Sequence, residues 1–214
     1  MHNNSILNPN YQYNEANLQN TLIAIDQIFT QYSKVLAIRI DLSFQYDLAH
    51  TMSREDAVWY LQKLRNNIRN NQLFQHLITY FSKLEYGEMK GWHFHFCFCF
   101  NGQQNKNAPW FANCIGAYWS QVIVGNQLGL FYSCHQKDYD QNGIGLINYF
   151  DTEKIHVFKS IIAYLCKIDQ TTLNQFTDLP KNPRTFFKGQ LPEAPPEKLG
   201  RPRLYTLESN SISS

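Results

Sequence analysis

The sequence predicts an α+β fold, in which an antiparallel sheet is combined with helices. Segments with apolar residues at helical spacing alternate with short β-rich segments, in the order helix, strand, helix, strand, strand, helix, strand, helix. The second and third of these strands are separated only by a short segment around Gly87 to Gly91, as in a hairpin. The inner six elements match a ferredoxin-like (split βαβ) pattern, with the helices mainly on one face of the sheet.

The first part of the chain contains two of these helices with a strand between them. Asn17 to Tyr32 has apolar residues at helical spacing and predicts an N-terminal helix. Val35 to Leu42 is short and β-rich, and we expect a strand there. Ser53, with Asp56 three residues later, is typical of a helix N-cap, and about four turns of apolar periodicity follow.

Three more strands and two more helices follow along the chain. The expected strands are Ile78 to Tyr86, Trp92 to Phe100 and Leu128 to Cys134. Pro109 fits the first turn of a helix, because an N–H at that position would have no intrahelical hydrogen-bond partner. The last predicted helix spans Glu153 to Ile168.

Composition limits the kind of protein. With 43% hydrophobic and 17% charged residues, the chain can bury a core and is not disordered. The net charge of +2 excludes a strongly basic coat. Five cysteines without a CxxC pair suit reduced thiols. No apolar run approaches the ~18 residues of a membrane helix, and the first residues lack the features of a signal peptide. We therefore expect a cytoplasmic protein with no membrane partner.

Basic residues and prolines gather toward the C-terminus. Residues 180–214 hold six Lys or Arg against three Glu, and six of the eight prolines. Such a stretch cannot hold regular structure for long. We expect three parts: an N-terminal helical extension (1–33), a central domain (34–179) and a Pro-rich basic arm (180–214). The arm either wraps the domain, reaches a polyanion or remains solvated.

The strand from Trp92 to Phe100 holds two candidate metal ligands. Successive side chains point to opposite faces of a strand, so Trp92 and four phenylalanines share one face, while His93 and His95 share the other. Residues two apart lie about 6.5–7 Å from each other, close enough for two imidazoles to bind one ion. The alternative is a solvated face with two incidental histidines.

A carboxylate from the preceding strand would complete the site. Glu85 lies eight residues before His93, and a hairpin would place it across from the histidines; Glu88 is the alternative, but it falls in the turn. Two imidazoles and a carboxylate suit Mg²⁺ or Mn²⁺ acting on a phosphate. Cys97 and Cys99 would favour zinc, but their distance along the strand makes one site awkward, and we interpret them as space-filling residues.

The last predicted helix offers Tyr164 and Lys167. They lie three residues apart and are therefore neighbours on a helix surface. A phenolate is a competent nucleophile when a nearby cation or metal favours its ionised form. A packed tyrosine beside a surface lysine is the alternative interpretation.

Together and in this order, these residues resemble the HUH endonucleases, and most closely the rolling-circle replication initiators of filamentous phages (inoviruses) and their prophage-borne relatives. The resemblance extends over about residues 34 to 190 and is carried by Glu85, Gly91-Trp92-His93-Phe94-His95, Tyr164-Leu165-Cys166-Lys167 and Arg184-Thr185-Phe186. It implies that His93, His95 and Glu85 bind a divalent cation, that Tyr164 is the nucleophile, and that Lys167 is the basic residue of the tyrosine motif.

The activity implied by this resemblance is nicking and joining of single-stranded DNA through a covalent 5′-phosphotyrosine, which initiates rolling-circle replication. The implied partners are single-stranded or replication-origin DNA, with host replication proteins as further candidates, in the host cytoplasm if a phage encodes the chain. Ser160 and Ile168 occupy the positions where some initiators carry a second tyrosine, so a single-tyrosine enzyme is implied.

Other functions remain open at the level of sequence. A transposase or a relaxase could be built on the same catalytic domain, and a ferredoxin-like nucleic-acid-binding module without catalysis is the alternative from another class. Exposed aromatic residues such as Trp59 or Tyr86 are candidates for stacking on unpaired bases, with core packing as the other explanation.

Overall fold

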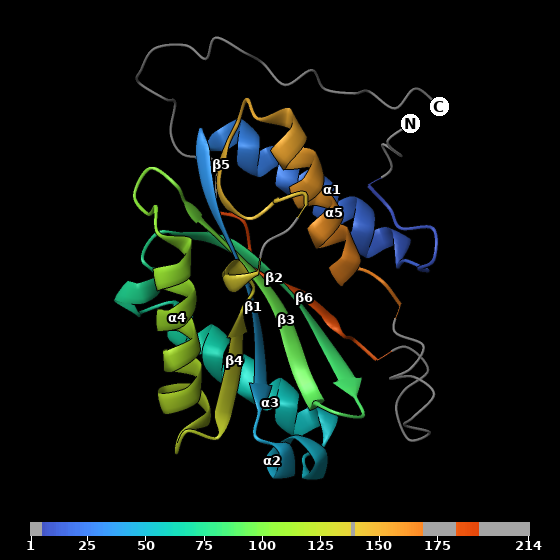
Figure 1. Ribbon diagram of the computed structural model, residues 1–214, viewed down its shortest axis with the longest axis vertical. Helices are drawn as coiled ribbons and strands as arrows, with labels where there is room; N and C mark the ends of the chain where they lie inside the picture. The colour runs from blue at the N-terminus through green and yellow to red at the C-terminus, as the bar shows by residue number, and fades with distance from the viewer. Residues whose placement is uncertain (1–5, 138–139, 169–182, 193–214) are drawn as a thin grey trace.

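A single antiparallel sheet forms the centre of the molecule, and helices pack on both of its faces. Figure 1 presents this arrangement in a computed structural model, which describes residues 6–137, 140–168 and 183–192. The strand order is β4-β1-β3-β2-β6, and β5 also pairs with β1. The coarse α+β class predicted from the sequence is therefore confirmed.

Six strands and five α-helices build the described part of the chain. The strands are β1 (Lys34–Phe44), β2 (Leu77–Gly87), β3 (Gly91–Asn101), β4 (Gly129–Ser133), β5 (Gly145–Asn148) and β6 (Phe186–Lys188). The helices are α1 (Glu15–Gln31), α2 (Tyr46–Thr51), α3 (Arg54–Ile68), α4 (Ala108–Tyr118) and α5 (Thr152–Leu165). Two short 3₁₀ turns, η1 (Gln72–Phe74) and η3 (Cys134–Gln136), and a π-helical segment after α4, η2 (Trp119–Val124), complete the set. None of the described helices has the length and apolar character needed to cross a lipid bilayer.

The predicted helices and strands are all present, and the expected helix N-cap is formed. The Ser53 hydroxyl accepts a hydrogen bond from the Asp56 N–H at 3.0 Å, and the Asp56 carboxylate accepts one from the Ser53 N–H at 2.9 Å. This reciprocal capping box fixes the start of α3. The last helix is shorter than predicted: α5 ends at Leu165, so Lys167 lies just beyond the helix, in a bridge with Tyr13, and not on the helix surface. Three elements were not predicted, namely α2, β5 and β6.

The two faces of the sheet pack against different helices. On one face, alternate residues such as Ile38 and Phe96 pack against α2, α3 and α4. On the other, Ala37, Cys97 and Cys99 pack against α1 and α5, which is the space-filling role interpreted for the cysteines. Of the helices expected in the split βαβ pattern, α3 and α4 lie together on one face, and the additional N-terminal and C-terminal helices, α1 and α5, cover the other. At one end of the sheet the second face is also apolar, and α1 and α5 remove it from water.

The same face is polar beyond the end of α5. There β1 carries Asp41 and Ser43, β3 carries His93 and His95, and β2 carries Glu85, at positions that alternate with core residues. No described helix packs over this part of the sheet (Figure 1). The fold thus places a polar area directly beside the C-terminal end of α5.

Part of the predicted basic arm belongs to the sheet. Phe186 lies opposite Lys83 in the antiparallel pairing of β6 with β2, and both Phe186 and Phe187 are buried. For residues 183–192 the wrapping alternative therefore holds, whereas 193–214 lie outside the described residues. The boundaries predicted at 33/34 and 179/180 stay predictions.

Candidate metal and tyrosine site

Glu85, His93 and His95 come together on the polar part of the sheet. In the β2–β3 hairpin Glu85 stands opposite His93, and His95 follows on the same face. One ligand atom from each residue lies within 4.8 Å of the others, so the group could hold a metal ion. Glu85 and His93 are buried, and the His95 side chain is only 12% exposed. Glu88, the alternative third ligand, is exposed in the turn and is not part of the group.

The Nδ1 atom of each imidazole is held by a hydrogen bond, and Nε2 of His95 also lies 3.3 Å from Glu85 Oε2. His93 Nδ1 lies 3.0 Å from the Gly91 carbonyl oxygen, and His95 Nδ1 lies 2.7 Å from Asp41 Oδ1. Since Nδ1–H donates in each case, Nε2 of each ring is the atom that faces a cation. Burial also lowers the pKa of His93, which favours the neutral ring that a metal requires.

Both carboxylates of the site are ionised at neutral pH. Burial acts to raise the pKa of Asp41, but the hydrogen bond from His95 and the charge of Arg39, whose Nη1 lies 2.5 Å away, lower it to about 2. Burial is likewise outweighed at Glu85, where His95 and Lys167 lower the pKa to about 2. The pKa of His95 is raised, because its bonds to the two carboxylates exceed the opposing effect of burial.

One carboxylate oxygen of Glu85 accepts no hydrogen bond from the described residues, and a bound cation would supply a contact for it. Its Oε2 lies 3.3 Å from His95 Nε2 and its Oε1 lies 3.2 Å from Lys167 Nζ, but buried Oε1 accepts no hydrogen bond from the described residues. A buried polar atom without a hydrogen bond is unfavourable. The chemistry of the donor set and this oxygen therefore fit a divalent cation.

The end of α5 brings the candidate nucleophile to this group. Lys167 Nζ donates a hydrogen bond to Tyr164 Oη at 2.7 Å, and the Tyr164 and His95 rings are 6.2 Å apart between centroids. The buried Lys83 donates from Nζ to the Lys167 carbonyl oxygen, which ties the end of the helix to β2. The one ammonium of Lys167 therefore contacts both the phenol and Glu85.

The pKa of the Tyr164 phenol is not lowered, although the ammonium of Lys167 lies beside it. Burial and the charge of Glu85 raise the pKa of Tyr164, and Lys167 offsets this only in part. Burial acts to lower the pKa of Lys167, but its contacts with Tyr164 and Glu85 raise it, so the side chain remains an ammonium. Lys167 thus favours the phenolate, but these residues alone do not lower the phenol's pKa.

The segment before α1 also contacts the tyrosine. Tyr13 forms an isolated antiparallel bridge with Lys167, and the Tyr11 ring lies edge-on to Tyr164 with 5.6 Å between centroids. Lys167 Nζ lies 5.4 Å from the centre of the Tyr11 ring. Sequence reasoning missed these supports, because the pairing joins two distant parts of the chain.

Asp41 and Arg39 were also missed as parts of the site. They are charged residues at alternate positions of an otherwise apolar strand, and that pattern was available in the sequence. Of the predicted stacking residues, Trp59 lies on α3, which packs on the face away from the metal group, and Tyr86 packs edge-on to Trp92 at 5.2 Å. Neither supports stacking at this site.

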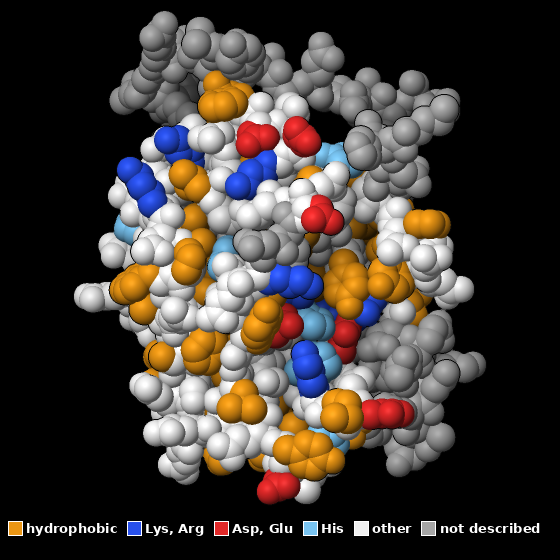
Figure 2. Space-filling model, in the orientation of Figure 1, with side chains coloured by type: hydrophobic (Ala, Val, Ile, Leu, Met, Phe, Trp, Pro, Cys, Tyr) orange, Lys and Arg blue, Asp and Glu red, His pale blue; other side chains and the backbone are white. Residues whose placement is uncertain are grey.

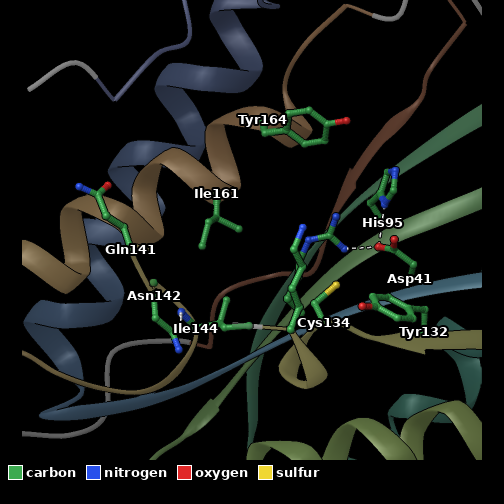
Figure 3. A pocket seen from close by; sticks show the side chains of 12 residues that line it. Asp41, His95, Tyr132, Cys134, Gln141, Asn142, Ile144, Ile161 and Tyr164 are labelled. Atoms are coloured by element: carbon green, nitrogen blue, oxygen red, sulfur yellow. Dashed lines mark hydrogen bonds and ion pairs between the residues drawn. The ribbon is translucent and has the colours of Figure 1, made fainter. Parts of the chain in front are cut away.

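A cavity of about 680 Å³ adjoins the tyrosine and is called here the tyrosine cavity. Its lining includes Arg39, Asp41, His95, Tyr132, Ile161 and Tyr164. Figure 3 shows Tyr164 beside His95 and Asp41 at one end, with Gln141, Asn142 and Ile144 at the other. In Figure 2, acidic, basic and histidine side chains gather near the middle of this face, with hydrophobic side chains around them.

The fold and the site define an α+β domain that carries a candidate metal group beside a tyrosine. The family model for the YagK/YfjJ C-terminal domain matches residues 1–178. The chain therefore belongs to the YagK/YfjJ C-terminal domain family. No curated protein and no solved structure matches it.

Proposed function

We propose that this chain is a metal-dependent, HUH-type endonuclease that nicks and joins single-stranded DNA through Tyr164 and thereby initiates rolling-circle replication. One observation carries the proposal: Lys167 Nζ lies 2.7 Å from Tyr164 Oη and 3.2 Å from Glu85 Oε1, so nucleophile and metal group meet at one point. We also propose a ferredoxin-like (split βαβ) topology, which is supported by the strand order β4-β1-β3-β2 and by the position of α3 and α4 on one face.

Glu85, His93 and His95 would hold Mg²⁺ or Mn²⁺. Two imidazoles and one carboxylate leave coordination positions open for a phosphate oxygen and water. When bound, the cation would neutralise charge on a non-bridging phosphate oxygen. Asp41 would act as a positioning residue, because it holds the Nδ1 proton of His95 and keeps Nε2 on the ligand side.

The proposed bond changes at the phosphate are those that the resemblance to HUH endonucleases implies for Tyr164. Its phenol loses a proton to solvent, and Oη attacks the phosphorus in line. The bond from phosphorus to the 3′ oxygen breaks, and this oxygen takes up a proton from solvent to leave as a 3′ hydroxyl. The 5′ phosphate remains joined to Tyr164, so a later attack by a 3′ hydroxyl rejoins the strand. The ammonium of Lys167 stabilises the phenolate before the attack.

A covalent adduct is the decisive test. We expect that randomised single-stranded oligonucleotides labelled at their 3′ ends, incubated with the protein and Mn²⁺, give a slowly migrating labelled band on a denaturing gel. The label belongs at the 3′ end, because the protein stays on the fragment with the new 5′ phosphate. Tyr164→Phe and addition of a chelator should each abolish the band. An adduct that persists in Tyr164→Phe would refute the assignment of the nucleophile, and binding without any adduct would indicate a non-catalytic module.

A further inference from the structure

A second hollow, of about 400 Å³, borders the candidate metal group at His93. It lies between α2, the turn joining β2 to β3, and β4, and we call it the aromatic hollow. Asp41 and Tyr132 line both this hollow and the tyrosine cavity, so the two depressions adjoin on either side of the histidine pair. Apart from these residues, its lining includes Tyr46, Met89, Lys90, Leu130 and Phe131.

Large apolar side chains of the aromatic hollow are exposed to solvent. The exposed fractions are 85% for Met89, 64% for Tyr46, 47% for Tyr132 and 46% for Leu130, whereas the ring of Phe131 lies against Gly116 of α4. Single exposed apolar residues need no explanation, but a contiguous group beside polar residues marks a binding surface. This group adjoins His93, so it lies directly beside the polar area that carries the candidate metal ligands.

The Tyr46 ring is held in place before any ligand binds, and the position of Tyr132 is set by strand register. The Tyr46 ring stacks on His50 with 4.0 Å between centroids, and the two nitrogens of His50 lie 2.9 Å from the carbonyl oxygens of Tyr46 and Glu88. His50 thus joins α2 to the β2–β3 turn. Tyr132 stands opposite Asp41 in the β1–β4 pairing, with Asp41 between it and His95, so the register sets its place on the same face of the sheet. Fixed rings lose little conformational entropy on binding.

We propose that the aromatic hollow is a stacking subsite for unpaired bases of the strand whose phosphate lies at the metal group. This inference rests on the proposed function. Unpaired bases present faces that stack on aromatic side chains, whereas the faces inside a duplex are already stacked. Lys90 is the one Lys or Arg among the lining residues. The hollow therefore offers aromatic surface for bases, and little positive charge for a phosphate backbone. This chemistry favours single-stranded nucleic acid over a duplex.

Binding of a strand with and without bases tests the subsite. Fluorescence anisotropy would compare labelled oligothymidylate with a strand of equal length made of abasic nucleotides, in a Tyr164→Phe background that prevents cleavage. We expect tighter binding of oligothymidylate, and roughly 5-fold or greater loss of that affinity in Tyr46→Ala and in Tyr132→Ala, with abasic binding unchanged. Tyr132→Phe, which keeps the ring, should retain the affinity.

Trp110→Ala is the matched control, because this exposed aromatic lies on α4, away from the hollow, and its loss should change neither affinity. Equal binding of the two strands, or oligothymidylate binding that is unchanged in both tyrosine variants, would overturn the subsite. Tyr46 and Tyr132 lie on different elements, so a folding defect in one variant, detected by circular dichroism, leaves the other as the test.

The covalent adduct separates this inference from the proposed function. Adduct formation together with unchanged affinity in the alanine variants would retain the nuclease and reject the subsite. Base-dependent binding that is lost in those variants, without any adduct in the unsubstituted protein, would retain the subsite and reject the nuclease.

Discussion

Replacing Asp41 by Asn tests how the site is organised, because the side chain keeps its shape and loses its charge. In the folded protein the pKa of Asp41 is lowered from 3.8 to about 2. At 1.36 kcal/mol per pKa unit, the ionised carboxylate contributes about 2 kcal/mol to the free energy of unfolding. Because the folded pKa is the lower one, this contribution is present above about pH 4 and is lost as the pH falls toward 2.

Asp41→Asn should therefore destabilise the metal-free protein by about 2 kcal/mol at neutral pH, measured by urea unfolding in the presence of a chelator. The difference from the unsubstituted protein should shrink as the pH falls below about 4. Replacing the charged acceptor of His95 Nδ1 by a neutral amide should also weaken Mn²⁺ binding about 10- to 100-fold in calorimetric titrations. Unchanged Mn²⁺ affinity in a folded variant would refute the positioning role, and a pH-independent stability difference would refute the electrostatic argument.

Three other changes probe separate parts of the structure. Glu85→Gln should reduce Mn²⁺ affinity by more than about 10-fold in the same titrations, whereas Glu88→Gln, in the exposed turn, should not; equal effects would reject the assigned ligand. Hydrogen bonds to the Glu88 carbonyl and to a second backbone carbonyl raise the pKa of His50, so its stabilising effect is present below pH 6.5 and is lost as the pH rises through the folded pKa. The melting temperatures of the unsubstituted protein and His50→Gln should accordingly differ more in acid than in alkali, and a constant difference would contradict this reasoning. Ser53→Ala, which removes the N-cap of α3, should cost about 1 kcal/mol in urea unfolding, and no loss would mean that the capping box is not a significant contributor.

Local patterns predicted those elements whose signals lie within a few residues. The alternation in Trp92 to Phe100 assigned both faces of β3 correctly, because every residue of this segment follows the same alternating pattern. By contrast, α2 has only six residues, too few for helical periodicity to be seen. The four residues of β5 and three of β6 become strands by pairing with β1 and β2, and such pairing is not encoded locally.

The same distinction applies to the candidate site. Glu85 and the two histidines were predicted because a hairpin connects them. Asp41 was not, because its place depends on β1 pairing with β3 and β4, which sets it opposite His95 and Tyr132. Registers between strands so far apart in the sequence follow from packing of the whole sheet. The aromatic hollow was missed for this reason, since its exposed rings come from two segments, α2 and β4, that lie far apart in the sequence.

The bridge between Tyr13 and Lys167 has a practical consequence for anyone who trims this protein. A fragment starting at residue 34 would retain the strands that carry the candidate metal ligands, but it would lack the N-terminal residues that pair with the segment just after α5. It would also uncover the apolar surface that α1 now shields. Engineering that grafts or minimises the candidate site therefore has to keep both ends of the 6–168 stretch.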